Sequence, residues 1–301
     1  MLMPTPLENS YRCCQSIARQ RARNFYYGFR LLPRSRRDAL CAVYAVMRYC
    51  DDVADGNAGA VEKAQKLRQW KDSLGRALQG DYDGNPILQA FHHAVRQYAI
   101  PAEYFWELIA GAEMDLSIHR YRTFKDLHQY CYRVASVVGL CSLHILGFRD
   151  PAAKKLAEEC GIAFQLTNIL RDLRQDAQSG RIYLPLEDLE RFHYPAEALE
   201  AGIANPQFQQ LMLFEVARAH DFYQRAFPLI GMVEPESRPA LWTLISIYRG
   251  ILKAIERNPE TVFIRRAGLS GIEKVGVVLR AAALQLQRKA GWEPRWERLH
   301  A

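Results

Sequence analysis

The stretch RSRRDALCAVYAVMRYCDDVAD, residues 34–55, decides how the rest of the chain is interpreted. It follows Pro33 and stops at Gly56, which are common start and stop signals for a helix. At about 100° per residue, four polar side chains fall on one narrow stripe: Tyr44, Arg48, Asp51 and Asp55. Asp52 lies on its flank, and the opposite face is apolar. Carboxylates this close together repel one another, so the helix requires a positive partner.

The same design recurs in the helix that is expected to end at Gly180. Its polar stripe is spaced three, four and four residues: Gln165, Asn168, Asp172 and Asp176. Apolar residues such as Phe164 and Leu170 fill the other faces. Two separate helices thus each present a D-x-x-x-D pair, with extra polar groups one turn upstream.

Oxygen ligands in this arrangement suit hard cations, and Mg²⁺ in particular is held by a few carboxylates together with substrate phosphates. If the two stripes face each other, metal ions between them cancel the carboxylate repulsion and bind a diphosphate. For either stripe alone, a solvated helix face with internal ion pairs is an equally good explanation. The two together favour the metal site. No histidine or cysteine has the spacing of a zinc ligand.

Helical periodicity dominates the remaining sequence, and no convincing alternating strand pattern occurs. We expect helices at residues 7–27, 34–56, 60–78, 86–98, 101–118, 123–147, 151–180, 206–228, 238–257 and 269–289. Residues 181–195 are expected to form a loop or flap with a short helical turn. The sequence has no internal repeat, and no linker divides it into segments of different composition. We therefore predict one all-α domain over residues 1–301, with a core of about 11–290.

Composition limits the partners of the protein. The 301 residues are 49% hydrophobic, enough for a large core, and the formal net charge is +7. This balance favours a partner that carries phosphate, or an anionic membrane surface. Nucleic acid is disfavoured, because no basic run is interleaved with stacking aromatics.

The seven cysteines are scattered and form no CxxC pair, so we expect reduced packing residues in a cytoplasmic protein. The first residues lack the layout of a signal peptide. The longest uncharged run, residues 134–148, is too short to span a bilayer. Peripheral contact with the inner membrane remains open.

Three blocks of the chain carry a family resemblance: NFYYGFRLLPRSRRDALCAVYAVMRYCDDVAD, YRTFKDLHQYCYRVASVVGL and FQLTNILRDLRQDAQSGRIYLP. Together they resemble the squalene/phytoene synthase family, from about Tyr11 to about Arg266. The resemblance implies a single bundle of α-helices of the isoprenoid synthase type around a deep apolar cavity, with both aspartate motifs at its mouth. It also implies the head-to-head condensation of two allylic isoprenoid diphosphates, with release of pyrophosphate.

The resemblance also assigns roles to individual residues. The Mg²⁺ ligands would be Asp51, Asp55, Asn168, Asp172 and Asp176. The catalytic residues would be Tyr130 and the four aspartates of that set. Diphosphate would be held by Arg48, Gln165 and Arg171, by the tyrosines Tyr44 and Tyr248, and by a turn made of Arg21, Ala22, Arg23 and Asn24. Tyr130 aligns with a tyrosine that acts in ionisation or proton removal, which suits a phenol.

Structural alternatives exist for several of these residues. The tyrosines could be core residues whose hydroxyl groups reach water. Arg171 could pair with a neighbouring aspartate and have no other role. Arg265 or Arg266 lies either near phosphate or on the surface. Glu113 and Asp115, beside His119, are interpreted as structural.

Three departures from the family pattern stand out: Asn24 where many members have serine, Ser136 in place of a small glycine, and Gln175 in place of an acidic residue. None removes a predicted metal ligand. Ser136 is expected to reshape the cavity wall.

The resemblance leaves three reactions open. The first choice is presqualene diphosphate synthase acting on two farnesyl diphosphates, as in the hopanoid route. The alternative is phytoene synthase acting on two geranylgeranyl diphosphates. NADPH-dependent squalene synthase is third, and NADPH is expected only in that case. From other classes, a non-catalytic helical scaffold would lose the motif aspartates, and a chain-elongating synthase or terpene cyclase would lack the contexts YCYRVA and NILRDLRQD.

Overall fold

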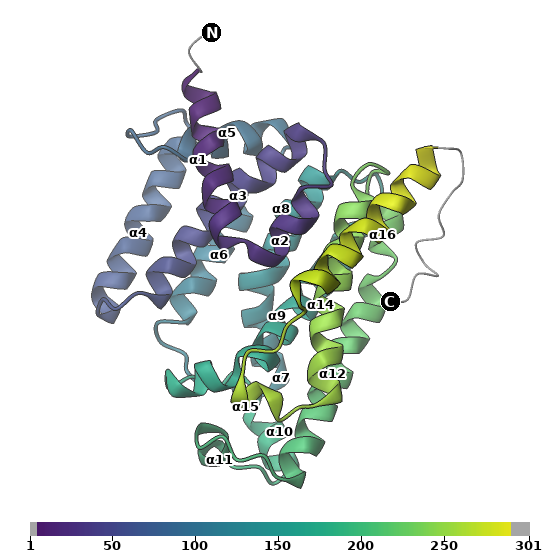
Figure 1. The fold of residues 1–301 in the computed structure, drawn as a ribbon. Coiled ribbons are helices and arrows are strands. Elements are labelled where there is room, and N and C mark those ends of the chain that lie inside the picture. The colour runs from purple at the N-terminus through teal and green to yellow at the C-terminus, as the bar shows by residue number, and fades with distance from the viewer. Residues whose placement is uncertain (1–4, 290–301) are drawn as a thin grey trace.

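The expected helices are present in a computed structural model, which describes residues 5–289 (Figure 1). They are α1 (Pro6–Arg21), α2 (Arg23–Phe29), α3 (Arg34–Asp55), α4 (Ala60–Ala77), α5 (Leu88–Gln97), α6 (Glu103–Met114), α7 (Phe124–Cys131), the π-helical turn η1 (Tyr132–Ser136), α8 (Val137–Leu146), α9 (Ala153–Gln178), α10 (Leu186–Arg191), α11 (Ala196–Glu200), α12 (Pro206–Ala226), α13 (Leu229–Met232), α14 (Arg238–Arg257), α15 (Thr261–Ile264) and α16 (Gly271–Lys289). The all-α class is confirmed. The predicted core boundary at residue 290 lies outside the described residues.

Local sequence accounts for several helix ends. At the start of α7, the Thr123 hydroxyl accepts from the Asp126 amide while the Asp126 carboxylate accepts from the Thr123 amide. This reciprocal cap satisfies two backbone donors that a helix leaves open. At the other end of the same helical segment, Gly147 adopts a φ of 79° and stops α8.

Two of the expected helices are interrupted. The sequence predicts one helix over residues 7–27, but the chain turns at Ala22, which ends α1 and begins α2. The turn allows α2 to pack against α14, a tertiary contact that local propensity does not encode. The predicted helix 123–147 contains the π-helical turn η1, and such turns often occur at functional sites.

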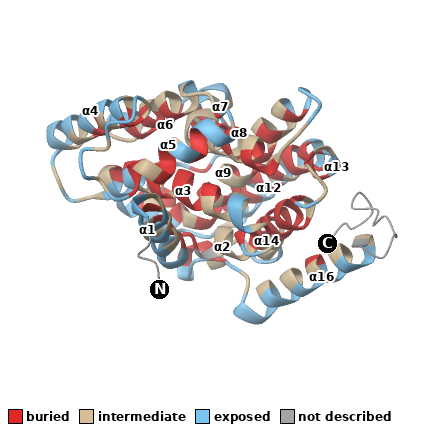
Figure 2. Ribbon diagram, turned by 90° about the horizontal axis from the view of Figure 1, so that it is seen from above, coloured by how far each residue is buried: buried red, intermediate tan, exposed pale blue. Residues whose placement is uncertain are grey.

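Helix α9 lies at the centre of the bundle and packs against α8, η1, α12 and α14 (Figure 1). Buried residues concentrate on the faces that these helices turn toward one another (Figure 2). Gly161 is needed for this packing, because a Cβ there would lie only 2.5 Å from the Cα of Ser136 in η1. The outermost helix, α16, lies along α14 and α2 on the rim of the molecule (Figure 2).

The segment after α9 is the predicted flap, with the short helix α10 inside it. It runs beside residues 119–122: the Ile182 amide donates to the His119 carbonyl, and the Leu186 amide donates to the Tyr121 carbonyl, both at 2.9 Å. Within residues 5–289 the only β-type pairing consists of two isolated bridges. The hydrogen bonds between residues 119–122 and the flap place Arg181 and Tyr183 beside the end of α6.

All seven cysteines are free thiols, and six of them are buried, as expected for packing residues. In the part of the chain that the structure describes, no helix has the length and apolar character needed to cross a bilayer.

Candidate active site

Both aspartate stripes line the same cavity, which has a volume of about 400 Å³. Its walls are mainly apolar and come from α2, α3, α6, η1, α8, α9 and α14, with Phe25, Phe29 and Leu244 among the lining residues. Of the predicted site residues, ten line it: Tyr44, Arg48, Asp51, Asp55, Tyr130, Gln165, Asn168, Arg171, Asp172 and Asp176. Two segments more than a hundred residues apart therefore meet across one apolar space.

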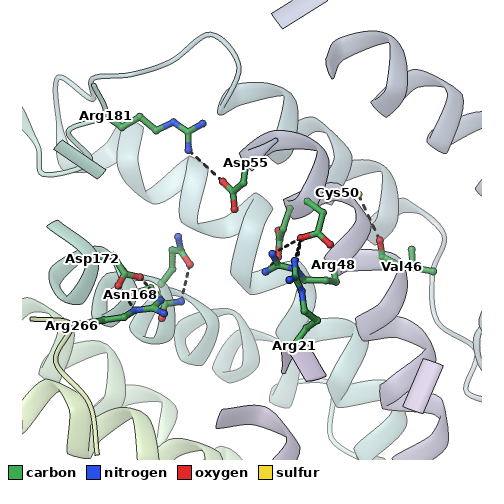
Figure 3. Close-up of polar contacts among 12 residues, drawn as sticks. Arg21, Val46, Arg48, Cys50, Asp55, Asn168, Asp172, Arg181 and Arg266 are labelled. Carbon is green, nitrogen blue, oxygen red and sulfur yellow. Dashed lines mark hydrogen bonds and ion pairs between the residues drawn. The ribbon is translucent and has the colours of Figure 1, made fainter. Parts of the chain in front are cut away.

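On α3, the arginines bind the flanking aspartate. Arg48 hydrogen bonds to Asp52 through two nitrogens, and Arg21 donates to the same oxygen at 2.5 Å (Figure 3). Asp51 lies 3.7 Å from Arg48, and Asp55 lies 3.8 Å from Arg181. The two aspartates of the D-x-x-x-D pair thus have longer ion pairs than Asp52, and neither is hydrogen bonded to Arg48 or Arg181.

The environment of Asp51 disfavours its charged form. Its side chain is 57% exposed and lines the cavity, where protein atoms surround it. Loss of hydration there, followed by repulsion from Asp55 and Asp115, raises the pKa of Asp51 to about 7 despite the nearby Arg48. A cation placed between these carboxylates would remove the penalty.

On α9, the arginines bind a member of the pair itself. Asp172 accepts from Arg171 at 2.5 and 3.0 Å, and from Arg266 at 2.7 and 2.9 Å (Figure 3). Burial alone would raise the pKa of Asp172, but these hydrogen bonds outweigh it and lower the pKa. One turn on, burial and repulsion from Asp172 raise the pKa of Asp176 to about 7.

The donor set fits a hard divalent cation. The Oδ1 atom of Asn168 is buried and has no hydrogen-bond partner, while its Nδ2 donates to Gln165 at 3.3 Å. An unpaired amide oxygen next to carboxylates of raised pKa is suited to a cation. Within residues 5–289, however, no three His, Cys, Asp or Glu side chains converge on one point as a metal cluster. The two stripes are thus separate groups of oxygen donors, one on α3 and one on α9, that line the same cavity.

Three functional candidates were missed by sequence reasoning: Asp115, Arg181 and Tyr183 all line the cavity. Asp115, interpreted from the sequence as structural, directly follows the last residue of α6 and accepts hydrogen bonds from Tyr130 and Tyr183 at the cavity wall. Arg181 and Tyr183 follow directly after the second stripe at alternate positions of an extended segment. That spacing was the available signal.

Several predicted residues lie outside the cavity wall. Arg21 is tied to Asp52, Ala22 is buried at the break between α1 and α2, and Asn24 is half-buried on α2. The side chain of Arg23 is outside the described set. Tyr248 is buried behind the wall, where it stacks on Phe164 at 4.3 Å between ring centroids and is hydrogen bonded to Arg171.

Ser136, expected from the sequence to reshape the cavity wall, does not line the cavity itself. Its side chain is fully buried and donates to the Glu158 carbonyl at 2.8 Å, so it joins η1 to α9 instead of facing the cavity. Its neighbours Ala135 and Gly139 form that part of the wall.

Comparison with known proteins agrees with this geometry. The family model described as squalene/phytoene synthase matches residues 18–273. The chain belongs to the squalene/phytoene synthase family. It is 39% identical over 282 residues to a phytoene synthase from Mycobacterium tuberculosis, covering 93% of this chain and 92% of the relative. It is 38% identical over 280 residues to a phytoene synthase from Arthrospira platensis, covering 89% and 90%.

Solved structures of squalene/phytoene synthase relatives show the same bundle. A dehydrosqualene synthase in complex with a ligand superposes with a TM-score of 0.85 at 28% identity, covering 94% of this chain and 100% of that one. Squalene synthase HpnC from Alicyclobacillus acidocaldarius gives a TM-score of 0.79 at 29% identity, covering 85% and 96%. The isoprenoid synthase type of fold is confirmed, as is the coarse function: an enzyme class that joins isoprenoid diphosphates head to head.

Proposed function

We propose that this squalene/phytoene synthase relative condenses two geranylgeranyl diphosphates head to head, as a phytoene synthase, with release of pyrophosphate. One observation carries the condensation: two carboxylate stripes from separate helices line a single apolar cavity. The polar part suits diphosphates and cations, and the apolar part suits isoprenoid chains.

The choice of chain length is supported by the relatives. The sequence alone favours two farnesyl diphosphates and presqualene diphosphate. The relatives at 38–39% identity are named phytoene synthases, whereas the squalene and dehydrosqualene synthases are 28–29% identical. We therefore rank geranylgeranyl diphosphate first and farnesyl diphosphate second. NADPH would be needed only for squalene.

Mg²⁺ is the proposed cofactor. Asp51 and Asp55 on one side, and Asn168, Asp172 and Asp176 on the other, would hold it. When bound, Mg²⁺ would stabilise the negative charge of the departing pyrophosphate.

The residues of the chain supply the remaining conditions. Arg48 and Arg171 line the cavity beside the stripes, where they can bind diphosphate oxygens. The apolar walls exclude water, which would trap an allylic cation as an alcohol. Tyr130 lies in the same cavity, where its hydroxyl can act on the reacting chain.

The experiment is a product analysis. The purified protein is incubated with Mg²⁺ and either geranylgeranyl or farnesyl diphosphate, with and without NADPH, and products are identified by mass. We expect pyrophosphate release and a C40 product from geranylgeranyl diphosphate. A C30 product from farnesyl diphosphate alone would establish the presqualene alternative. No pyrophosphate from either substrate would favour a non-catalytic helical scaffold.

We also propose peripheral contact with an anionic membrane through the outer face of α16. Ile272, Leu279 and Leu286 follow one another at intervals of about two turns and are 86, 64 and 67% exposed. Val275, 47% exposed, widens this apolar stripe, and the exposed Arg280 lies at its edge in a chain of net charge +7. Membrane contact would suit an enzyme with apolar products, and α14 and α2 beneath α16 both contribute to the cavity wall.

Sedimentation with vesicles tests this surface. The wild type should sediment with anionic vesicles and much less with zwitterionic ones, whereas Leu279→Gln/Leu286→Gln should stay in the supernatant. Val61 on α4, 81% exposed, provides the matched control as Val61→Gln. Equal sedimentation of all three proteins contradicts the proposal, and a concentration-dependent dimer lost in the double variant would assign the stripe to a second copy.

A further inference from the structure

One carboxylate in the cavity belongs to neither aspartate stripe. Asp115, at the end of α6, accepts two phenol hydroxyls on different oxygens: Tyr183 donates to Oδ1 at 2.8 Å, and Tyr130 donates to Oδ2 at 3.1 Å. The two hydroxyl oxygens lie 3.4 Å apart. All three side chains line the cavity. One carboxylate acceptor and two phenol donors, contributed by three separate segments of the chain, thus form one hydrogen-bonded group.

The surroundings hold these groups in place. The rings of Tyr130 and Tyr183 stack with centroids 5.2 Å apart and an interplanar angle of 23°. Tyr121 packs against both, at 5.4 and 5.9 Å. Arg181 is hydrogen bonded to Tyr183 and interacts electrostatically with Asp115. Neither phenol can turn away from Asp115 without disturbing the stack.

The direction of these hydrogen bonds determines what Tyr130 presents to the cavity. A phenol has one proton to donate, and its oxygen retains lone pairs that accept. The Tyr130 hydroxyl has Asp115 as its acceptor at 3.1 Å and the Tyr183 oxygen at 3.4 Å, so its proton is engaged and its lone pairs can accept from a substrate. Among the cavity-lining residues described, none is a histidine, lysine or glutamate, so Asp115 is the base outside the stripes that can receive a proton from Tyr130.

We propose that Asp115 is a positioning residue that holds Tyr130 as a proton acceptor and takes the phenol proton in turn. The inference rests on the proposed head-to-head condensation. When the allylic cation has been attacked, a C–H bond of the substrate breaks and its electron pair closes the cyclopropane ring. That proton goes to the Tyr130 oxygen, the original O–H bond of Tyr130 breaks, and its proton goes to Oδ2 of Asp115. Tyr130 is neutral before and after the step.

The protonation behaviour of Asp115 is compatible with this role. Removal from bulk water raises the pKa of Asp115, although the hydrogen bonds from Tyr183 and Tyr130 oppose the shift. A carboxylate of raised pKa holds a transferred proton better than an ordinary aspartate.

The test separates ionisation from proton removal. Asp115→Asn keeps an acceptor for the phenol but cannot take its proton. With geranylgeranyl diphosphate and Mg²⁺, we expect C40 product to fall about 100-fold or more, while pyrophosphate release falls far less and prenyl alcohol accumulates. Glu113→Gln, an exposed carboxylate two residues away, should retain the wild-type ratio of product to pyrophosphate.

A second variant guards against a folding defect. Tyr130→Phe should shift the same ratio in the same direction, and Asp115→Asn/Tyr130→Phe should be no worse than the poorer single variant, because both act on one step. A wild-type ratio in folded Asp115→Asn, or fully additive losses in the double variant, overturns the inference. If Asp115→Asn does not fold, an unchanged ratio in Tyr130→Phe overturns it instead. Failure of the wild type to release pyrophosphate would reject the proposed function itself.

Discussion

The α3 and α9 stripes share the same D-x-x-x-D spacing and the same cavity, yet their arginines bind different aspartates. On α3, Arg21 and Arg48 bind Asp52, which lies outside the pair. On α9, Arg171 and Arg266 bind Asp172, which is one of the pair.

If Mg²⁺ binds as we propose, the two stripes would reach the cation-bound state from different starting points. Asp51 and Asp55 are available, and a cation relieves their repulsion directly. Asp172 would have to exchange two arginines for that cation, and both guanidinium groups would then be free to bind the proposed diphosphate. In the α9 stripe, arginines neutralise a member of the aspartate pair. In the α3 stripe, no arginine whose side chain the structure describes is hydrogen bonded to either member, and we call this stripe open.

Single substitutions that remove one carboxylate, from either the α3 or the α9 stripe, should have the largest effect on turnover. Asp51→Asn and Asp172→Asn should each lower turnover about 1,000-fold or more, since both carboxylates would serve the metal. Their stabilities should differ. Asp172→Asn removes the charge partner of nearly buried Arg171 and should lower the free energy of unfolding by about 1–3 kcal/mol, whereas Asp51→Asn should leave it unchanged or higher.

Steady-state kinetics and urea unfolding monitored by circular dichroism measure these two effects. Equal destabilisation by both substitutions would contradict the contrast between an open and a neutralised stripe. Loss of helical content in Asp51→Asn would show that its cluster is structural.

The two adjacent arginines of the segment after α15 sharpen the comparison. Arg266 binds Asp172, while Arg265 is exposed. If Arg266 turns to the diphosphate when a cation takes Asp172, Arg266→Gln should raise KM about tenfold, the effect of one lost charged hydrogen bond. Arg265→Gln provides the matched control and should keep the wild-type KM. Identical kinetics for the two variants would leave Arg266 with a purely structural role.

Sequence reasoning located both stripes because helical spacing maps directly onto a face. Every member of the two predicted stripes lines the cavity. The same reasoning did not find Arg181 or Tyr183, because backbone pairing between residues 119–122 and the flap brings them to the site. That contact joins segments about sixty residues apart and has no periodic signature.

The errors in local structure have the same origin. Nothing in the composition around Ala22 breaks a helix, and the turn there follows from packing of α2 on α14. Ser136 was expected to reshape the cavity wall, but its side chain hydrogen bonds to the Glu158 carbonyl of α9, a tertiary contact that the local sequence does not encode. Which arginine binds which aspartate was equally hidden, since Arg48 has Asp51 and Asp52 at neighbouring helical positions.

Each stripe contains one carboxyl group of raised pKa, and the pH dependence of stability should reveal both groups. The pKa values of Asp51 and Asp176 rise from 3.8 to about 7, so the folded protein keeps these protons after the unfolded chain has released them. Without metal, stability contributed by these groups is therefore lost as pH rises from about 4 to about 7. Mg²⁺ with inorganic pyrophosphate would bind the ionised forms, so we expect it to raise Tm by more at pH 8 than at pH 6.

Thermal unfolding followed by circular dichroism measures that difference, with Ca²⁺-free and Mg²⁺-free buffers as the reference. In Asp51→Asn/Asp176→Asn the Mg²⁺-dependent rise in Tm should become small and independent of pH. A wild-type shift of equal size at both pH values would show that these carboxyls do not control cation binding.

The smallest effect is expected at Asp52, the aspartate that the α3 arginines actually bind. Its side chain and that of Arg21 are each nearly half exposed, so Asp52→Asn should change the free energy of unfolding by less than about 1 kcal/mol. Arg48, released from Asp52, lies 3.7 Å from Asp51 and would neutralise it in part, which makes the α3 stripe resemble the α9 stripe. Turnover should therefore fall only a few-fold, with a higher Mg²⁺ requirement, when measured beside Asp51→Asn. A loss as large as that of Asp51→Asn would place Asp52 inside the site and remove the distinction between the two stripes.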